Sequence, residues 1–445
     1  MKLEFFADRK TDNVALKFGI IGAGQCGGKI TDLFASLKNN DGHRYYETMV
    51  VNSWEGDLKP LQYVARERRY LLKGGEGCGH KPKVCERLMD DPANQEMLME
   101  AIEKGFKDAD AFYVIAGLAG GTGTGLISSI IKLIDYIKNT PLLDSGLSPK
   151  PINAIVTMPR SIDTGLDKAN AVDELNRLAG MFKEGILSSL VVIDNEKSFR
   201  EYVEHTKLNP NDMSYQDWMD YSNQTVVQAI HEFNIGIMYP SDLNFDTQDL
   251  KNIFEDTPGI ITISKTVFEQ ETINSGTLID DIISCFNTGN VLADGHDLPK
   301  AKHAGYLIVR PRNINIPQST FNELDIRLAQ ETPNALTRPG SCIVNPNRDD
   351  NRLIIYTINK IVQMPKRLRE ELEPEVKKLM ESMTGTEDAL AEIAVSTTSY
   401  ANAFTRGVKR RVSSKIFERT DTQNSPQNQE LATQRISRAD IFKRN

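Results

Sequence analysis

The sequence is poor in the residues that build disulfide frameworks and zinc sites. Its 445 residues include five cysteines and six histidines. The number of cysteines is odd, no two of them form a Cys-x-x-Cys pair, and no His-Glu-x-x-His motif occurs. These absences exclude a disulfide-stapled secreted domain, a zinc ribbon and a metalloprotease, and they predict a reducing, cytoplasmic compartment.

Long apolar runs and net positive charge are also missing. No apolar stretch reaches the roughly 18 residues that cross a membrane, and residues 1–12 are charged rather than signal-like. The net charge of −8 argues against nucleic-acid binding by the whole chain. We therefore expect no membrane partner and no direct contact with nucleic acid. The length predicts about two or three globular domains.

The densest glycine cluster lies between a predicted strand and a predicted helix. Residues 111–115 form an apolar run typical of a buried strand, and residues 126–134 carry helical apolar spacing. Between them stand four glycines within the six positions that begin at Gly120. A turn without Cβ atoms lets backbone N–H groups surround an anion, and the dipole of the next helix adds attraction. The stretch predicts a phosphate-binding loop, with further donors from Thr122 and Thr124.

Strands alternate with helices along the first half of the chain. Strands are predicted at 16–21, 48–52, 69–72, 111–115, 152–158 and 189–193. This alternation predicts an α/β fold with a doubly wound parallel sheet, whose site lies at the carboxyl ends of the strands. A long amphipathic helix follows at about 213–233, and a second group of strands and helices lies beyond residue 249.

A second glycine-rich loop follows the first predicted strand. Gly22, Gly24 and Gly27 match the dinucleotide-binding spacing Gly-x-Gly-x-x-Gly. The second strand, however, ends in Asn52 rather than in the acidic residue that binds the ribose in such enzymes. A Walker A loop does not fit either, because Ile30 stands where a Mg²⁺-binding hydroxyl belongs. A nicotinamide- or flavin-dependent enzyme stays open as an alternative on these residues alone.

Two motifs on the predicted sheet resemble nucleotide-binding loops of a known family. Gly-Gln-Cys-Gly at 24–27 and Ala-Gly-Gly-Thr-Gly-Thr-Gly at 119–125 resemble the first and fourth loops of the tubulin/FtsZ family. The second motif is the signature of that family, and Ala119 is an accepted variant of its leading glycine. The resemblance extends over residues 16–385. It implies a protein that binds GTP or GDP with Mg²⁺, polymerises and hydrolyses GTP.

The resemblance implies a division of the chain into six parts. Residues 1–15 would form an N-terminal extension, 16–210 the GTP-binding domain and 211–240 a central helix. Residues 241–364 would form an α+β C-terminal activation domain, 365–385 a closing helix and 386–445 a flexible basic tail.

The resemblance also implies roles for the residues at matching positions. The first four loops would hold the phosphates and the edge of the base, and Gln25 would lie nearest to Mg²⁺. The residues at these positions are Gly22, Gly24, Gln25, Cys26, Gly27, Asn52, Gly77, Cys78, Gly79, Ala119, Gly120, Gly121, Thr122, Gly123 and Thr124.

The ribose and the base are expected at a fifth loop and at two asparagines. Pro159 and Asp163 match the fifth loop, and Lys168 stands one position from an arginine of the bacterial members. Asn195 and Asn223 match the two residues that read guanine. Each asparagine taken alone is also explained as a helix cap or a turn residue. The order of the motifs favours guanine recognition.

Asn244, Asp246 and Asp249 match the catalytic loop of the family, Asn-x-Asp-x-x-Asp/Glu. Hydrolysis of a phosphoanhydride needs a positioned water, and the nucleotide loops offer neutral donors without a carboxylate to orient it. The resemblance implies that these carboxylates dock from the next subunit, in a head-to-tail contact that propagates into a filament. The same residues also fit the N-cap and first turn of a helix.

Within the family the sequence is most similar to the TubZ group, which moves plasmid and phage DNA. Leu-Lys-Phe-Gly before the first loop and Thr-Pro-Gly at 257–259 carry this likeness. That group uses its tail to hold a DNA-bound adaptor, TubR, and here the residues after 401 carry a net charge of +6. The implied partners are a second copy of the chain and a TubR-type adaptor. We place the adaptor contact at Ile-Phe-x-Arg, which occurs at 416–419 and 441–444; a cell-division FtsZ is the alternative.

Overall fold

The computed structural model describes most of the chain before residue 385. The described residues are 13–140, 147, 150–207, 214–241, 243, 245–269, 277–288, 291–345 and 351–384. Asn244, residues 1–12 of the expected extension and the whole expected tail from 386 lie outside these ranges.

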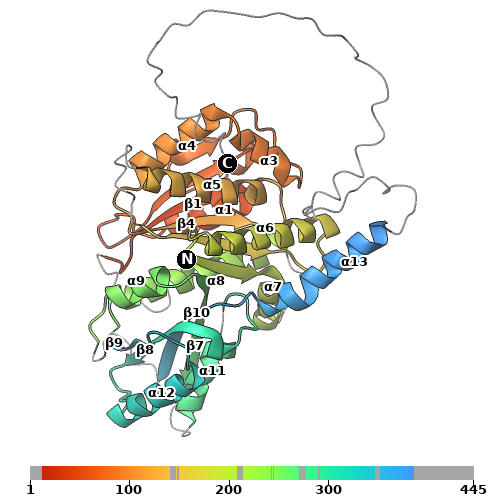
Figure 1. Cartoon of the computed structure of the whole chain (residues 1–445). Coiled ribbons are helices and arrows are strands. Elements are labelled where there is room, and N and C mark those ends of the chain that lie inside the picture. The colour runs from red at the N-terminus through yellow and green to blue at the C-terminus, as the bar shows by residue number, and fades with distance from the viewer. Residues whose placement is uncertain are drawn as a thin grey trace, which may run out of the picture.

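One sheet of ten strands organises the described part of the chain (Figure 1). Its strand order is β3-β2-β1-β4-β5-β6-β7-β10-β8-β9. The first six strands, each parallel to its neighbours, are β1 (Phe18–Ala23), β2 (Glu47–Asn52), β3 (Arg69–Leu71), β4 (Ala111–Gly117), β5 (Ile152–Met158) and β6 (Ser189–Asp194). Because these strands are parallel, their carboxyl ends meet at one edge of the sheet. The predicted α/β fold class and doubly wound sheet are confirmed.

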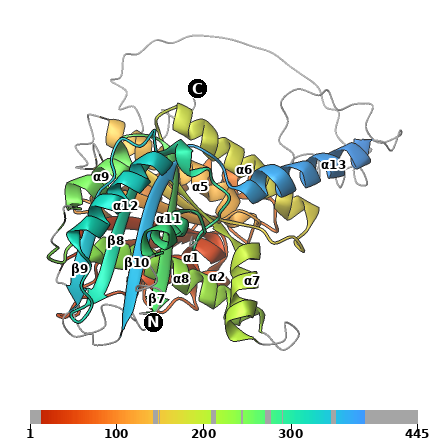
Figure 2. The same cartoon turned by 90° about the horizontal axis from the view of Figure 1, so that it is seen from below.

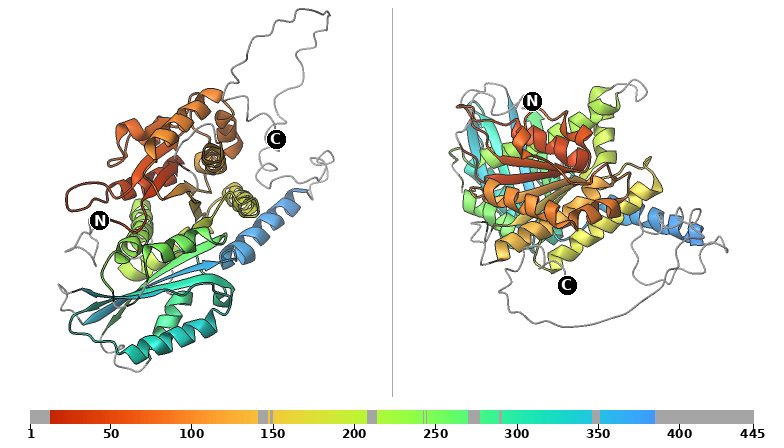
Figure 3. Two further views of the ribbon diagram at one scale, coloured as in Figure 1. Left: turned by 60° about the vertical axis from the view of Figure 1, so that its left-hand side comes forward. Right: turned by 90° about the horizontal axis from the view of Figure 1, so that it is seen from above.

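Helices cover both faces of this parallel part of the sheet (Figure 3). One face packs against α3 (Pro82–Met89), α4 (Pro92–Gly105), α5 (Thr122–Asn139) and α6 (Gly165–Lys183). The other face packs against α1 (Gly24–Ala35), α8 (Tyr215–Gly236) and α9 (Thr247–Glu255). The remaining helices of this half are α2 (Glu55–Leu58), the 3₁₀ turn η1 (Arg66–Arg68) and α7 (Asn195–Thr206).

The second half of the chain continues the same sheet. Its elements are β7 (Gly259–Glu269), α11 (Leu278–Thr288), the 3₁₀ turn η4 (Leu298–Lys300), β8 (Ala301–Pro311), α12 (Gln318–Glu331), β9 (Gly340–Asn345) and β10 (Arg352–Ile361). Strand β7 pairs parallel with β6 and antiparallel with β10, so it joins the two halves. Helices α11 and α12 cover one face of the added strands (Figure 2).

The central helix α8 spans the molecule from side to side. It begins beside α7 and ends on the side where α9 lies, as Figures 1 and 2 both show. Its 22 residues correspond to a length of about 33 Å. The helix therefore sets a fixed separation between the elements at its two ends.

The closing helix follows β10 and lies beside α6 (Figure 1). It contains a π-helical turn, η5 (Leu368–Leu372), and continues as α13 (Glu373–Thr384). Leu368, Leu372 and Val376 anchor it in the same core as α5 and α6. Within the described ranges, no helix combines the length and the apolar character needed to span a membrane.

Candidate functional site

The glycine-rich loop at residues 22–27 packs against the one at residues 119–125 at the carboxyl edge of the sheet. Gly24 begins α1 with φ at +70°, and a Cβ atom there would lie 2.7 Å from the backbone N of Gly123. A Cβ atom on Gly27 would lie 2.0 Å from the carbonyl oxygen of Ile115. Both positions therefore need glycine, because only glycine lets the backbones of the two loops approach this closely.

The N-termini of α1 and α5 point into this edge without side-chain caps. Among the described residues, no side chain accepts a hydrogen bond from the first turn of either helix, and neither first turn contains an acidic residue. Helices α6, α7, α8 and α9 each begin with a side-chain cap, whereas α2, α3 and α12, like α1 and α5, do not. The uncapped N–H groups and the positive ends of two helix dipoles suit an anion such as a phosphate.

The glycine-rich loop at residues 119–125 has one open side. A Cβ atom on Gly121 would lie 2.7 Å from the backbone N of Lys81, whereas one on Gly120 would meet no described atom within 4 Å. The Thr124 hydroxyl donates to the carbonyl oxygen of Gly120 at 2.6 Å, and the side chain is buried. The Thr122 hydroxyl lies 2.8 Å from that of Ser53. The hydroxyl proton of Thr124 is thus used inside the loop, which leaves Thr122 as the better placed donor.

The third loop, residues 74–81, closes over the glycine-rich loop at residues 119–125. Gly77, Gly79 and His80 all have positive φ. The buried side-chain amide of Asn170 on α6 donates to the carbonyl oxygens of His80 and Ala119, at 3.0 and 3.2 Å. Asn170 therefore fixes the third loop to the loop at residues 119–125. No motif in the sequence indicates this contact.

Two thiols at the site have shifted pKa values with different causes. Burial raises the pKa of the Cys26 thiol, which lies 3.8 Å from the Thr157 hydroxyl. Hydrogen bonds with Cys85, Ser53 and Thr122 lower the pKa of the Cys78 thiol. Cys78 thus belongs to the polar contacts that hold the third loop against Thr122.

Gln25 and Asn52 converge on an aspartate that the sequence analysis did not single out. The amide Nε2 of Gln25 donates to Asp57 Oδ1 at 3.1 Å, and Nδ2 of Asn52 donates to Asp57 Oδ2 at 3.2 Å. The amide nitrogens thus face Asp57, and Oδ1 of Asn52 accepts from the N–H of Trp54 at 3.1 Å, so this cluster offers Mg²⁺ the Asp57 carboxylate; Mg²⁺ takes few protein ligands and completes its shell with phosphates and water. In the described ranges no group of three or more His, Cys, Asp or Glu side chains forms a metal site by itself. The residues therefore fit Mg²⁺ only together with a bound phosphate.

The two asparagines expected to read guanine lie on neighbouring helices. Asn195 is the first residue of α7, and its neighbour Asp194, not Asn195, caps the helix by accepting from the N–H groups of Glu196 and Lys197. Asn223 is buried on α8, which packs against α7. Neither asparagine side chain has a hydrogen-bond partner within the part of the chain that the structure describes. Both amides are thus available to a ligand.

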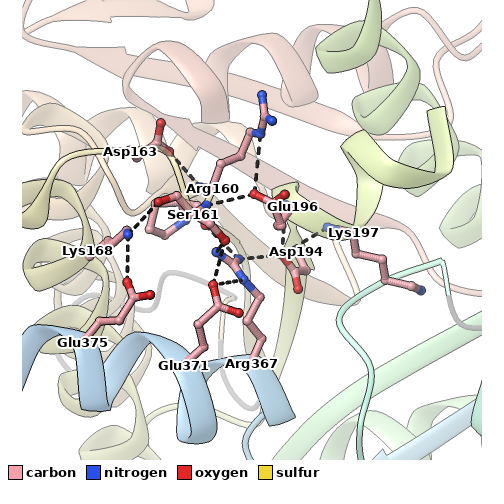
Figure 4. A network of polar contacts seen from close by, with 11 residues as sticks. Arg160, Ser161, Asp163, Lys168, Asp194, Glu196, Lys197, Arg367, Glu371 and Glu375 are labelled. Atoms are coloured by element: carbon pink, nitrogen blue, oxygen red, sulfur yellow. Dashed lines mark hydrogen bonds and ion pairs between the residues drawn. The ribbon is translucent and has the colours of Figure 1, made fainter. Parts of the chain in front are cut away.

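The fifth loop is a tight turn beside these asparagines. Asp163 accepts from the backbone N of Arg160 at 2.8 Å. The Arg160 guanidinium lies 3.7 Å from the ring centroid of Phe199 on α7 and 5.3 Å from that of Trp218 on α8. These stacked groups tie the loop to α7 and α8. Lys168 is directed elsewhere, donating to the carbonyl oxygen of Ser161 and to Glu375 on α13, at 2.7 and 2.8 Å (Figure 4).

Asp246 and Asp249 lie at the N-terminus of α9, on the other side of the molecule. Oδ1 of Asp246 accepts from the N–H groups of Gln248 and Asp249, and Oδ2 of Asp249 accepts from the N–H of Asp246 at 3.2 Å. The pair therefore forms the capping box that the sequence allowed. The other oxygen of each carboxylate takes no part in the cap. Burial raises the pKa of Asp249 above its ordinary value.

Two family profiles match the chain. The one described as "Tubulin/FtsZ family, GTPase domain" matches residues 17–202, and the one described as "Tubulin/FtsZ-like protein TubZ-like, C-terminal domain" matches residues 232–372. The matches thus cover both the parallel half of the sheet and the half that follows α8.

Individual relatives agree with these profiles. Tubulin-like protein TubZ of Bacillus thuringiensis subsp. israelensis is 27% identical over 384 residues, which cover 81% of this chain and 76% of that protein. The crystal structure of a GTPγS-form protofilament of TubZ from Bacillus thuringiensis serovar israelensis aligns with a TM-score of 0.72 at 25% identity, over 85% of this chain and 94% of that chain. A two-stranded TubZ-Bt filament aligns with a TM-score of 0.70 at 23% identity, over 85% and 93%, a likeness of fold.

Proposed function

Because the chain belongs to the tubulin/FtsZ family and is a GTPase, we propose that it polymerises head to tail and hydrolyses GTP only when the next subunit docks. One observation carries the proposal. Helix α1, which begins at the first of the glycine loops, contacts the first turn of α8 through Lys29 and Gln216, whereas α9, whose first turn carries Asp246 and Asp249, lies on the side where α8 ends; α8 itself is about 33 Å long. One chain cannot bring these groups together, whereas two chains stacked end to end can.

The division of chemical work follows from the groups at each end. The uncapped N-termini of α1 and α5 and the Thr122 hydroxyl bind and orient the phosphates. Asp246 and Asp249 of the docking subunit hold the attacking water, and a carboxylate accepts its proton as the bond to the γ-phosphorus forms. The β–γ anhydride bond breaks, so that GDP and inorganic phosphate are the products. The phosphates and the carboxylate of Asp57, beside Gln25 and Asn52, would hold Mg²⁺, and the ion would supply positive charge at the phosphate oxygens.

The free amides of Asn195 and Asn223 support guanine as the base. An amide presents both a donor and an acceptor, and guanine carries the complementary groups along its edge. Pro159 and Asp163 lie in the turn that flanks these asparagines, where the ribose would bind. By the same resemblance Cys26 would lie near the base, whereas Gln25, Cys78 and the glycines of the loops would lie on the phosphate side.

Addition of nucleotide to the purified full-length chain tests the proposal. We expect light scattering to rise with GTP and to fall as phosphate is released, with no rise for GDP, ATP or NAD. The expected preference over ATP rests on the match of Asn195 and Asn223 to the guanine-reading residues of the family. A chain that binds NAD, or that stays monomeric with GTP and Mg²⁺, would contradict the proposal and favour a dinucleotide-dependent enzyme.

We further propose that the filament segregates DNA through a TubR-type adaptor. The TubZ-like profile over residues 232–372 and the net charge of +6 after residue 401 support this over a role in cell division. Deletion of residues 440–445, which removes one Ile-Phe-x-Arg copy, should abolish co-sedimentation of a DNA-bound TubR-type adaptor and leave polymerisation intact. Adaptor binding at the wild-type level would refute a contact at this motif.

A further inference from the structure

The closing helix holds the fifth loop in place through hydrogen bonds. Ser161, in the middle of the loop, uses all three of its polar groups there (Figure 4). Its N–H donates to Glu196 at 2.9 Å, its carbonyl oxygen accepts from Lys168, and its hydroxyl donates to Glu371 of the π-helical turn at 2.7 Å. The conformation of the loop thus depends on a helix that lies about two hundred residues later in the chain.

Arg367 is the centre of this contact. Its side chain is only 9% exposed, and its Nη1 donates to the carbonyl oxygen of Pro159 at 2.8 Å and to Asp194 Oδ1 at 2.7 Å. Its Nε donates to Glu371 at 3.3 Å, within the same helix. One guanidinium therefore connects the fifth loop to the start of α7. Because the group is planar and its donors are fixed, it sets the distance between the two elements.

The carboxylate that Arg367 contacts is also the cap of α7. Asp194 Oδ1 accepts from Arg367 and from the first N–H groups of α7, and its side chain is 4% exposed. Burial raises the pKa of this carboxyl group, while Arg367 and the helix N–H groups oppose that rise. Asn195 follows Asp194 directly and begins the helix. A shift of the Arg367 side chain is thus transmitted to the backbone that carries Asn195.

We propose that Arg367 is a positioning residue for the nucleoside half of the site. It holds the fifth loop and the first turn of α7 at the spacing that the ribose and the base require, without contacting the ligand. The inference rests on the proposed function, since it takes the ligand of this edge to be a guanine nucleotide. Lys168 adds to the same clamp through Ser161 and Glu375.

A purely structural role for Arg367 predicts a different result from a positioning role. Loss of a structural contact lowers the stability of the fold and leaves the affinity of the folded protein unchanged. Loss of a positioning contact weakens binding of the nucleoside half, while turnover at saturating GTP is retained, because the phosphate loops and the docking carboxylates are untouched. Arg369 offers a matched control. From the same turn it donates to the carbonyl oxygens of Met364 and Gly295, and it contacts neither the fifth loop nor the first turn of α7.

The experiment compares full-length variants by GTP affinity, KM and turnover per polymerised subunit. Arg367→Met is expected to raise the dissociation constant for GTP about tenfold or more, since charge-assisted hydrogen bonds are lost. Its preference for GTP over ATP should fall, its turnover at saturating GTP should stay within about twofold, and Arg367→Lys should recover part of the affinity. Arg369→Met should bind GTP as the wild type does.

Ser161→Ala keeps the inference testable if Arg367→Met fails to fold. It removes the hydroxyl that contacts Glu371 and Arg367 without leaving a buried charge unpaired, so GTP affinity should fall about threefold. Wild-type affinity in both Ser161→Ala and any folded Arg367 variant would overturn the inference and leave the proposed function standing. A wild-type protein that does not bind GTP would overturn the proposed function and this inference together.

Discussion

Single glycines fix the geometry of the proposed phosphate loops. Gly24 is the clearest case. Its φ is +70°, and the backbone of Gly123 occupies the space that a Cβ atom at this position would need. A side chain at this position would both strain the backbone and push the two loops apart. Elsewhere glycine is dispensable: Gly180, inside α6, has open space at its Cβ position.

Gly24→Ala should therefore impair nucleotide binding selectively. We expect GTP affinity to fall about tenfold or more, because the αL penalty and the contact with Gly123 displace the loop. Gly180→Ala is the control, and it should leave affinity unchanged and stabilise the fold by about 1 kcal/mol. Binding of a fluorescent guanine nucleotide and thermal unfolding measure both effects. Equal affinities in the two variants would show that the loop does not contact the nucleotide.

The residue types and motifs predicted which side chains belong to the candidate site. The hydrogen-bond partners of those side chains could not be predicted from the sequence. Asn195 was open to a capping role, and the structure assigns the cap to Asp194 instead. Lys168 was compared with an arginine at the nucleotide, whereas it binds Ser161 and Glu375. Arg367 and Asp194 are 173 positions apart, a distance over which neither spacing nor periodicity carries information. The roles of the site residues in binding stay predictions.

At the scale of elements, α9 is held at both ends. Its N-terminus carries the capping box of Asp246 and Asp249. At its C-terminus the buried Lys360 of β10 donates to the carbonyl oxygen of Phe254 at 3.1 Å, and Ser189 donates to the same atom. Burial lowers the pKa of Lys360 to about 7, against the opposing charges of Asp256 and Glu255. The helix that presents the carboxylates of Asp246 and Asp249, which we propose to be catalytic, is thus anchored by a lysine that is costly to bury.

Lys360→Met should change the pH dependence of stability. Between the lowered pKa and the ordinary value near 10.5, the unfolded chain binds more protons than the folded chain, so Lys360 makes wild-type stability rise with pH in this window. The variant lacks that term. The free energy of unfolding of Lys360→Met minus that of the wild type should be largest near pH 7 and should fall as the pH rises. Urea titrations at several pH values test this, and a constant difference would contradict it.

Most elements were predictable because their signals are local. The apolar runs at 111–115, 152–158 and 189–193 predicted the central strands, and β4, β5 and β6 form there. Helix α6 was missed, although Thr164 and Asp167 form a capping box whose spacing marks a helix start. The π-helical turn at Leu368–Leu372 has no sequence signature; it places Arg367 and Glu371 against the fifth loop.

At the scale of the molecule, one continuous sheet and one long helix define two opposite ends. The sequence predicted two groups of strands, and the pairing of β6 with β7 joins them, which only a three-dimensional arrangement can reveal. The six-part division of the chain stays a prediction. A molecule with the proposed anion site at one end and the carboxylates of Asp246 and Asp249 at the other would be suited to head-to-tail assembly.

The central claim is that Asp249 completes hydrolysis in the neighbouring subunit, and its most direct test is turnover per polymerised subunit in Asp249→Asn. Asparagine keeps an oxygen that accepts from the N–H of Asp246, so the cap of α9 is preserved while the carboxylate is lost. Asp256→Asn, at the other end of α9, is the control. Polymer mass by sedimentation and phosphate release are measured together. We predict filaments of at least wild-type mass with turnover reduced about a hundredfold or more; filaments of Asp249→Asn that hydrolyse GTP at the wild-type rate would contradict the account.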